Sequence, residues 1–255
     1  MTSKSGELLR SLTHSLTTAF FPDTCKICEL PLGGWSSAPV CAACWDGVRP
    51  HAAENACTCC GLAFARAEAI GPEGLCPACE LAPPAYDRAL SLGRYEGELR
   101  SLIHLLKYEG MDALGSELGR RLAALGPRLP EADVVTTTPL HWRRRWQRGF
   151  NQSALVAREA ARIWKLPFEP GLLRRVKSTA PQAGRTRAER LVNVRGAFQV
   201  KNKSAASGRR ILLVDDVMTT GATLDACARV LKRAGARSVV AVTLARAVPD
   251  RLEVG

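Results

Sequence analysis

Residues 211–223 constrain the fold of this chain more than any other stretch. Four branched apolar residues begin it, and such a run is typical of a strand buried on both faces of a parallel sheet. The strand ends in two carboxylates, Asp215 and Asp216. From residue 222 to residue 234 apolar side chains recur at helical spacing, so a helix begins here. The stretch therefore predicts a strand, a short loop and a helix of an α/β protein.

The loop between this strand and this helix has the composition of an anion site. Its residues are Thr219, Thr220, Gly221, Ala222 and Thr223. Small residues let backbone N–H groups converge on an anion, and the N-terminus of a helix favours phosphate. Asp215 and Asp216 repel phosphate, so these two acceptors fit a sugar diol, or a Mg²⁺ ion that bridges to it. The stretch thus predicts a ligand with a phosphate group and a sugar.

Eight of the ten cysteines form four CxxC pairs, separated by 12, 12 and 15 residues. The pairs are Cys25 and Cys28, Cys41 and Cys44, Cys57 and Cys60, and Cys76 and Cys79. Each pair aims two thiolates at one point, which is typical of a zinc knuckle and not of a disulfide framework. We expect two structural Zn²⁺ sites, one from the first two pairs and one from the last two, with a cross-braced pairing as the alternative. Cys59 is then a bystander or a spare ligand, and Cys227 a small core residue.

The order of these motifs divides the chain into three segments. Residues 1–22 carry leucines at four-residue spacing and predict an amphipathic helix. Residues 23–82 hold the knuckles of a double zinc ribbon, and residues 85–255 form the α/β domain with the predicted phosphate site. No apolar run reaches the roughly 18 residues that a membrane helix needs, and the N-terminal segment lacks the apolar block of a secretory signal. We therefore expect no membrane insertion and a cytoplasmic location.

Positive charge is concentrated in one span. The formal net charge of the chain is +12. Residues 137–210 hold eighteen Lys/Arg and three Glu, a net charge of +15, whereas residues 1–84 hold five Lys/Arg and eight Asp/Glu. Zinc thiolate sites make the N-terminal segment more negative still, so it fits a stability or docking module better than a nucleic-acid clamp. The basic span predicts an anionic ligand or partner.

The remaining pattern supplies the other elements of a doubly wound sheet. We expect strands at 86–95, 133–138 and 239–244, helices at 98–108 and 111–125, a helix capped by Asn151 or Ser153 that ends at Trp164, and two short strands around a loop at 177–198. The loop at 139–152 should face the two aspartates across the carboxyl edge of the sheet. Its residues Arg143, Arg144 and Arg145 either grip an anion or form a solvated basic surface.

Two sets of residues resemble known families. Residues 211–223 resemble the fingerprint of type I phosphoribosyltransferases, which bind 5-phosphoribosyl 1-pyrophosphate (PRPP). The chain after Phe21 resembles the ComF family, competence-associated proteins with an N-terminal zinc ribbon and a phosphoribosyltransferase-like domain. This resemblance rests on the cysteine knuckles, Leu102-Ile103, Lys107-Tyr108-Glu109-Gly110, Pro139-Leu140-His141, Arg148-Gly149-Phe150-Asn151-Gln152, Gln182, Arg190, Asn193, Ala197-Phe198 and the DDVMTTGAT loop.

The resemblance implies a fold and a set of roles. The fold is that of type I phosphoribosyltransferases, an α/β fold with a doubly wound, mainly parallel sheet, preceded by a small double zinc ribbon. Asp215 and Asp216 would hold the ribose hydroxyls, with Mg²⁺ accompanying PRPP. Residues 219–223 would cradle the 5′-phosphate, and Arg148 would lie near the pyrophosphate.

The resemblance also implies a flexible loop that closes over the ligand, with Gln182 and Arg190 in it. Two residues depart from the family pattern. Arg185 stands where an apolar residue is expected, and Cys59 is additional. Both departures concern details and leave the family resemblance intact.

Two hypotheses for function follow. In the first, the chain is an enzyme that transfers a phosphoribosyl group from PRPP to a nitrogen nucleophile and acts in DNA uptake or natural transformation, with competence or recombination proteins as partners. In the second, it is a catalytically silent sensor of PRPP or a nucleotide that binds single-stranded DNA through the basic span 137–210. The charge of that span exceeds what one PRPP molecule requires.

Overall fold

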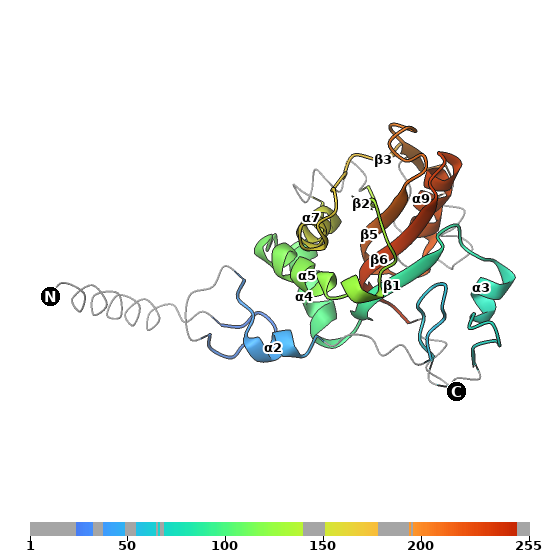
Figure 1. Cartoon of the computed structure of the whole chain (residues 1–255). Helices are drawn as coiled ribbons and strands as arrows, with labels where there is room; N and C mark the ends of the chain where they lie inside the picture. The colour runs from blue at the N-terminus through green and yellow to red at the C-terminus, as the bar shows by residue number, and fades with distance from the viewer. Residues whose placement is uncertain are drawn as a thin grey trace. The chain divides into compact units, whose positions relative to one another are not determined.

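The computed structural model describes residues 24–32, 38–48, 55–64, 66, 69–139, 151–177, 194 and 196–248 (Figure 1). The chain forms two compact units, residues 1–48 and residues 49–255. The division falls inside the predicted ribbon module 23–82, because the second pair of knuckles packs into the core of the larger unit. The predicted N-terminal helix, residues 1–22, lies outside the described residues.

The smaller unit is built around the first two CxxC pairs. Thr24 and Pro31 form an isolated antiparallel bridge that closes the first turn. Helix α2 (Ala42–Asp46) follows, and the Cys41 side chain at its N-cap accepts a hydrogen bond from the Cys44 N–H at 3.5 Å. Backbone donors of this kind stabilise the thiolate form of cysteine.

A four-stranded parallel sheet forms the centre of the larger unit. Its strands are β1 (Arg88–Arg94), β2 (Val134–Thr137), β5 (Arg210–Met218) and β6 (Ser238–Arg246), in the order β1-β6-β5-β2. All three pairs of neighbouring strands are parallel. A separate antiparallel pair is formed by β3 (Leu173–Arg175) and β4 (Phe198–Val200). The predicted parallel sheet and the two short strands beside it are confirmed.

Helices cover both faces of this sheet (Figure 1). They are α4 (Gly97–Tyr108), α5 (Ala113–Ala123), α7 (Gln152–Trp164) and α9 (Ala222–Arg233). The larger unit also contains the short helix α3 (Pro77–Leu81), which carries Cys79, and the 3₁₀ turn η2 (Gly126–Arg128). In Figure 1, α4, α5 and α7 group on one side of the sheet and α9 lies on the other. This is the predicted doubly wound arrangement. In the part of the chain that the structure describes, no helix is long and apolar enough to cross a membrane.

β5 is longer than the sequence predicts. Its residues 211–214 are each at most 1% exposed, as expected for a strand buried on both faces, and burying a side chain of this size contributes about 1.5–3 kcal/mol. The strand continues through Asp215 and Asp216, because its pairing with β6 extends to Met218 opposite Arg246. The two carboxylates therefore stand on the strand, as the sequence predicts, and the strand continues beyond them to Met218.

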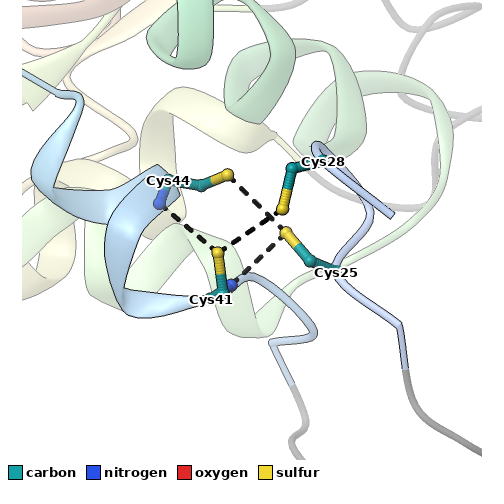
Figure 2. A group of neighbouring side chains, drawn as sticks. All are labelled: Cys25, Cys28, Cys41 and Cys44. Atoms are coloured by element: carbon teal, nitrogen blue, oxygen red, sulfur yellow. Dashed lines mark hydrogen bonds between the residues drawn. The ribbon is translucent and has the colours of Figure 1, made fainter. Parts of the chain in front are cut away.

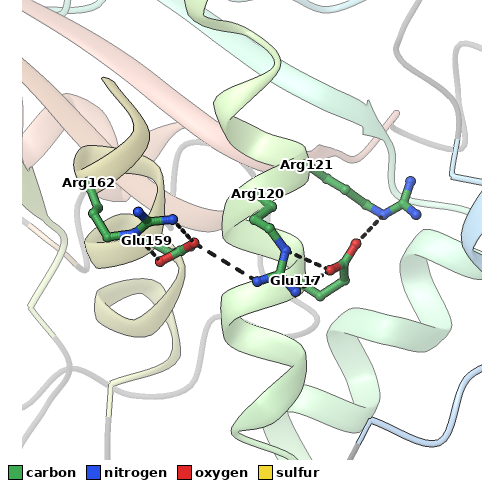
Figure 3. A network of polar contacts seen from close by, with 5 residues as sticks. All are labelled: Glu117, Arg120, Arg121, Glu159 and Arg162. Carbon is green, nitrogen blue, oxygen red and sulfur yellow. Dashed lines mark hydrogen bonds and ion pairs between the residues drawn. The ribbon is translucent and has the colours of Figure 1, made fainter. Parts of the chain in front are cut away.

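Helices α5 and α7 pack closely because two glycines line their contact. A Cβ atom on Gly115 would lie 2.8 Å from Leu155 Cβ, and one on Gly119 would lie 2.7 Å from the Val156 carbonyl oxygen. Ion pairs surround this contact and join Glu117, Arg120 and Arg121 of α5 with Glu159 and Arg162 of α7 (Figure 3). Exposed pairs of this kind contribute about 0–1 kcal/mol each, so the glycines set the spacing of the two helices.

Candidate functional site

Asp215 and Asp216 are held by side chains from two helices. The Ser153 hydroxyl of α7 donates to Asp215 Oδ1 at 3.1 Å, and the Asp216 backbone N–H donates to the same oxygen at 2.9 Å. Asp216 Oδ1 forms an ion pair with Lys107 Nζ of α4 at 2.8 Å. The two carboxylates therefore have different partners, Ser153 on α7 and Lys107 on α4.

The pKa of the Asp215 carboxyl is raised well above its ordinary value. Burial raises its pKa to about 7, and the charge of the adjacent Asp216 adds to the rise. Hydrogen bonds from the Thr138 side chain and the Asp216 N–H, together with the charge of Lys107, act in the opposite direction without cancelling it. A cation or hydrogen-bond donors on a ligand would favour the charged form of Asp215.

Lys107 is the functional residue that the sequence analysis missed. It was noted only as part of a family motif, yet its amine contacts Asp216, and both side chains are largely buried, at 16% and 14% exposed. A signal was present in the sequence. Lys107 lies four residues after Ile103, on the apolar stripe of α4, where a lysine needs a charged partner.

The predicted anion loop lies directly beside Asp215. A small hollow is lined by Asp215 and by residues 217–224, which include all five residues of the loop. Gly221 precedes α9 with a φ of 78°, a left-handed conformation that glycine adopts without strain. The Ala222 N–H donates a hydrogen bond to the Thr220 hydroxyl oxygen at 3.4 Å. The loop therefore opens the N-terminus of α9 toward the carboxylate, as the sequence predicts.

Unpaired polar atoms gather where β2 leads toward α7. Among the described residues, Thr137 Oγ1, Asn151 Oδ1 and both amide atoms of Gln152 are buried without a hydrogen-bond partner. Asn151 takes the N-cap position of α7, but its amide donates to the Thr138 carbonyl at 3.3 Å and makes no cap hydrogen bond. Asn151 therefore takes the predicted N-cap position of α7, but its side chain does not make the expected cap hydrogen bond. Buried unsatisfied groups are rare, and they often mark functional positions.

Three predicted ligand-binding residues lie outside the described residues. They are Arg148, in the loop between β2 and α7, and Gln182 and Arg190, in the loop between β3 and β4. The elements on either side of these loops match the predicted strands and helix. They are β2 and α7 for the first loop, and β3 and β4 for the second. The roles of these three residues stay predictions.

The first four cysteines form a compact sulfur cluster (Figure 2). The Sγ atoms of Cys25 and Cys44 lie 3.7 Å apart, and those of Cys28 and Cys41 lie 3.6 Å apart. Zn–S bonds of about 2.3 Å in a tetrahedron place neighbouring sulfurs about 3.8 Å apart. The donor set and its size suit a structural zinc ion.

The last two CxxC pairs form a second cluster of the same design. Cys57, Cys60, Cys76 and Cys79 bring their Sγ atoms within 4.8 Å of one another, and all four are buried. Gly61 has a φ of 64° directly after its CxxC pair, as the predicted knuckle turn requires, and Glu29 has a φ of 61° at the same place in the first cluster. In both clusters successive knuckles combine, which is the predicted pairing and not the cross-braced one.

Comparison with known proteins identifies two domain families in this chain. Residues 16–81 match the double zinc ribbon domain family, and residues 151–254 match the phosphoribosyl transferase domain family. The DNA utilization protein YhgH of Salmonella typhi is 32% identical over 231 residues, which cover 88% of this chain and 97% of that protein. Competence protein F of Haemophilus influenzae is 31% identical over 179 residues, 68% of this chain and 78% of the relative. The chain belongs to the ComF family.

Another ComF-family protein, competence protein ComFC of Bacillus subtilis, is 32% identical over 161 residues, 61% of this chain and 63% of the relative. Among solved structures, a glutamine PRPP amidotransferase from B. subtilis is similar at a TM-score of 0.37, with 25% identity over 52% of this chain and 26% of that one. That structural likeness is too remote to add to the family match. The phosphoribosyl transferase match of this ComF-family chain includes α7, β5, the anion loop and α9, whereas Lys107 lies outside both family matches.

Proposed function

We propose that this chain binds PRPP at the carboxyl end of β5. One observation carries the proposal: a single hollow is lined by a carboxylate, Asp215, and by the whole anion loop that opens α9. The loop N–H groups suit the 5′-phosphate, and carboxylates suit the ribose hydroxyls. PRPP carries both kinds of group, a 5′-phosphate and two neighbouring hydroxyls, on one ribose.

Mg²⁺ would accompany the ligand. The oxygen donors of Asp215 and Asp216 fit this ion, which binds through one or two carboxylates and keeps several waters. When bound, Mg²⁺ neutralises charge on the phosphates. Asp216 is engaged by Lys107 at 2.8 Å, so this ion pair has to open before that carboxylate serves a ligand. Zinc fits the two cysteine clusters in a structural role.

The proposed reaction is phosphoribosyl transfer. The bond between the anomeric carbon and the pyrophosphate oxygen breaks, pyrophosphate leaves with the electron pair, and a nitrogen nucleophile bonds to the anomeric carbon and loses a proton. The pyrophosphate would be received by Arg148, and the loop with Gln182 and Arg190 would exclude water. The names of the relatives, DNA utilization protein and competence protein F, support a role for this chain in DNA uptake or transformation.

Single-stranded DNA binding without turnover is the second candidate. It is favoured by the net charge of +15 in residues 137–210, since PRPP itself carries only about five negative charges. Binding through this span would weaken steeply with salt, and Arg143→Ala/Arg144→Ala/Arg145→Ala would reduce the salt dependence. Salt-independent affinity, or affinity unchanged in the triple variant, would rule this candidate out.

Calorimetric titration with Mg²⁺ and PRPP tests the main proposal. The wild type should bind PRPP saturably, and Asp215→Asn/Asp216→Asn should lose binding while it remains folded. Asp133→Asn, which changes a carboxylate paired with Arg210 at the start of β5, is the matched control and should bind as the wild type does. Absence of wild-type binding refutes the proposal. Pyrophosphate release with a panel of bases and amines then separates the enzyme from the sensor.

A further inference from the structure

The two cysteine clusters differ in what surrounds them. The first belongs to the smaller unit, and its Cys28 is exposed. The second belongs to the larger unit, and its four cysteines share one hydrophobic core with Met218, which precedes the anion loop, and with Ala222, which belongs to it. A metal in the second cluster therefore acts inside the core that carries the candidate phosphate site.

Backbone contacts fasten the second cluster to the edge of the sheet. The Ala89 N–H of β1 donates to the Cys59 carbonyl at 2.7 Å. Gly61 packs so closely that a Cβ atom there would lie 2.9 Å from the Ala89 carbonyl oxygen. Cys59 is not one of the four grouped cysteines, but its backbone joins the knuckle to β1.

Tyr86 connects this cluster with the anion loop. Its side chain is buried, and its hydroxyl oxygen would lie 3.1 Å from a Cβ atom placed on Gly221. Tyr86 also belongs to the same hydrophobic core as the four cysteines of the second cluster. Burial raises the pKa of Tyr86, and the charge of Arg246 opposes the rise.

Arg246, at the end of β6, forms hydrogen bonds with the backbone at the start of the anion loop. Its Nη1 donates to the carbonyl oxygens of Met218 at 2.9 Å and Ala247 at 3.2 Å, and also to that of Thr219. The residue is only 5% exposed, and its Nε has no hydrogen-bond partner among the described residues. A buried guanidinium bonded to neutral carbonyls needs a negative charge nearby. Four thiolates with one Zn²⁺ carry a net charge of −2, and these cysteines share one hydrophobic core with Met218, whose carbonyl Arg246 holds.

We propose that zinc in the second cluster holds the anion loop in its binding shape, with Arg246 as the positioning residue and Tyr86 as the packing link. The metal fixes the knuckle against β1, and its thiolates balance the guanidinium that fastens the Met218 and Thr219 carbonyls. Zinc in the first cluster has no such role. The inference rests on the proposed function only where it predicts ligand affinity.

Hydrogen exchange of the amides of residues 217–224, in the ligand-free full chain, tests the shape of the loop without any ligand. Arg246→Met should speed exchange of this segment by at least about tenfold, and Arg246→Lys should restore part of the protection. Arg120→Met, an arginine on the exposed face of α5, is the matched control and should leave it unchanged. Unchanged exchange in a folded Arg246→Met protein overturns the proposal.

Removing each zinc site in turn tests the metal. Cys76→Ser/Cys79→Ser should lower the zinc content by one ion and speed exchange of the loop. Cys25→Ser/Cys28→Ser should also cost one ion but leave the loop protected, and equal loosening in both variants would refute the proposal. If the second-cluster variant does not fold, the Arg246 series decides.

Calorimetry with Mg²⁺ and PRPP separates this inference from the proposed function. Where the wild type binds, Arg246→Met and the second-cluster variant should bind at least about tenfold more weakly, a loss of about 1.4 kcal/mol. Wild-type affinity in Arg246→Met would contradict the coupling. If the wild type does not bind PRPP, the proposed function fails, and the exchange data still decide whether the second cluster shapes the loop.

Discussion

Replacing Asp215 with asparagine should stabilise the folded protein in a strongly pH-dependent way. The pKa of Asp215 is raised from 3.8 to about 7 by burial and by the charge of Asp216. Between these two values the folded state holds a proton that the unfolded state has lost, so stability falls as pH rises. The slope is about 1.4 kcal/mol per pH unit, which gives on the order of 4 kcal/mol as an upper limit between pH 4 and pH 7. Asp215→Asn keeps the shape and removes the titration.

Urea unfolding of the zinc-loaded wild type and Asp215→Asn at several pH values measures this effect. The advantage of the variant should be small near pH 4, grow up to about pH 7 and then level off. Asp133→Asn is a control of opposite sign. Arg210 holds the pKa of Asp133 down to about 2, so this variant should be less stable at neutral pH, and its deficit should shrink only below about pH 4. An Asp215→Asn advantage that is constant with pH, or that shrinks as pH rises, would refute the reasoning.

Three other substitutions, one of them with a control substitution, probe the site and the fold, each by urea unfolding. Lys107→Met should destabilise the protein by about 1–3 kcal/mol at pH 8, because Asp216 keeps a largely buried charge without its partner; a stability equal to that of the wild type would contradict the ion pair. Gly221→Ala should cost about 1–3 kcal/mol, since its φ is 78° and the new Cβ meets Met218 Cε at 2.8 Å. Gly208→Ala has a φ of 73° but open space around it, and should cost less; equal losses would remove the steric part of the explanation. Gly119→Ala should cost about 1–3 kcal/mol by forcing α5 from α7, and a neutral result would refute the close packing.

Local patterns in the sequence predicted the elements of the fold well. Short CxxC turns need no distant information, so the four cysteine pairs followed from spacing, whereas the structure decides that successive knuckles combine and not cross-braced ones. The apolar run at residues 211–214 and the helical spacing after Ala222 likewise specified β5 and α9. The error in β5 has a physical cause: its extension to Met218 depends on pairing with β6, which local composition does not report.

The charged partners within the site could not be predicted in the same way. Asp216 and Lys107 are 109 residues apart, and only the packing of α4 near the end of β5 brings them together. Ser153 was predicted only as an alternative to Asn151 for the helix cap, and the sequence did not predict that its hydroxyl donates to Asp215. A buried charge therefore predicts that some partner exists, and the tertiary fold decides which one it is.

Two largely buried cations stabilise the site when no ligand is bound. Lys107 neutralises Asp216, and Arg246 holds the carbonyls at the start of the anion loop. An acid pair that already has an ammonium group binds a second cation poorly, because the incoming ion must displace the first one and also lose its own water. If PRPP is the ligand, its ribose hydroxyls and phosphates would compensate for the opened ion pair, whereas Mg²⁺ alone would not. The ligand and its metal would then bind together, and Lys107 would be free to meet the negative charge that the ligand brings.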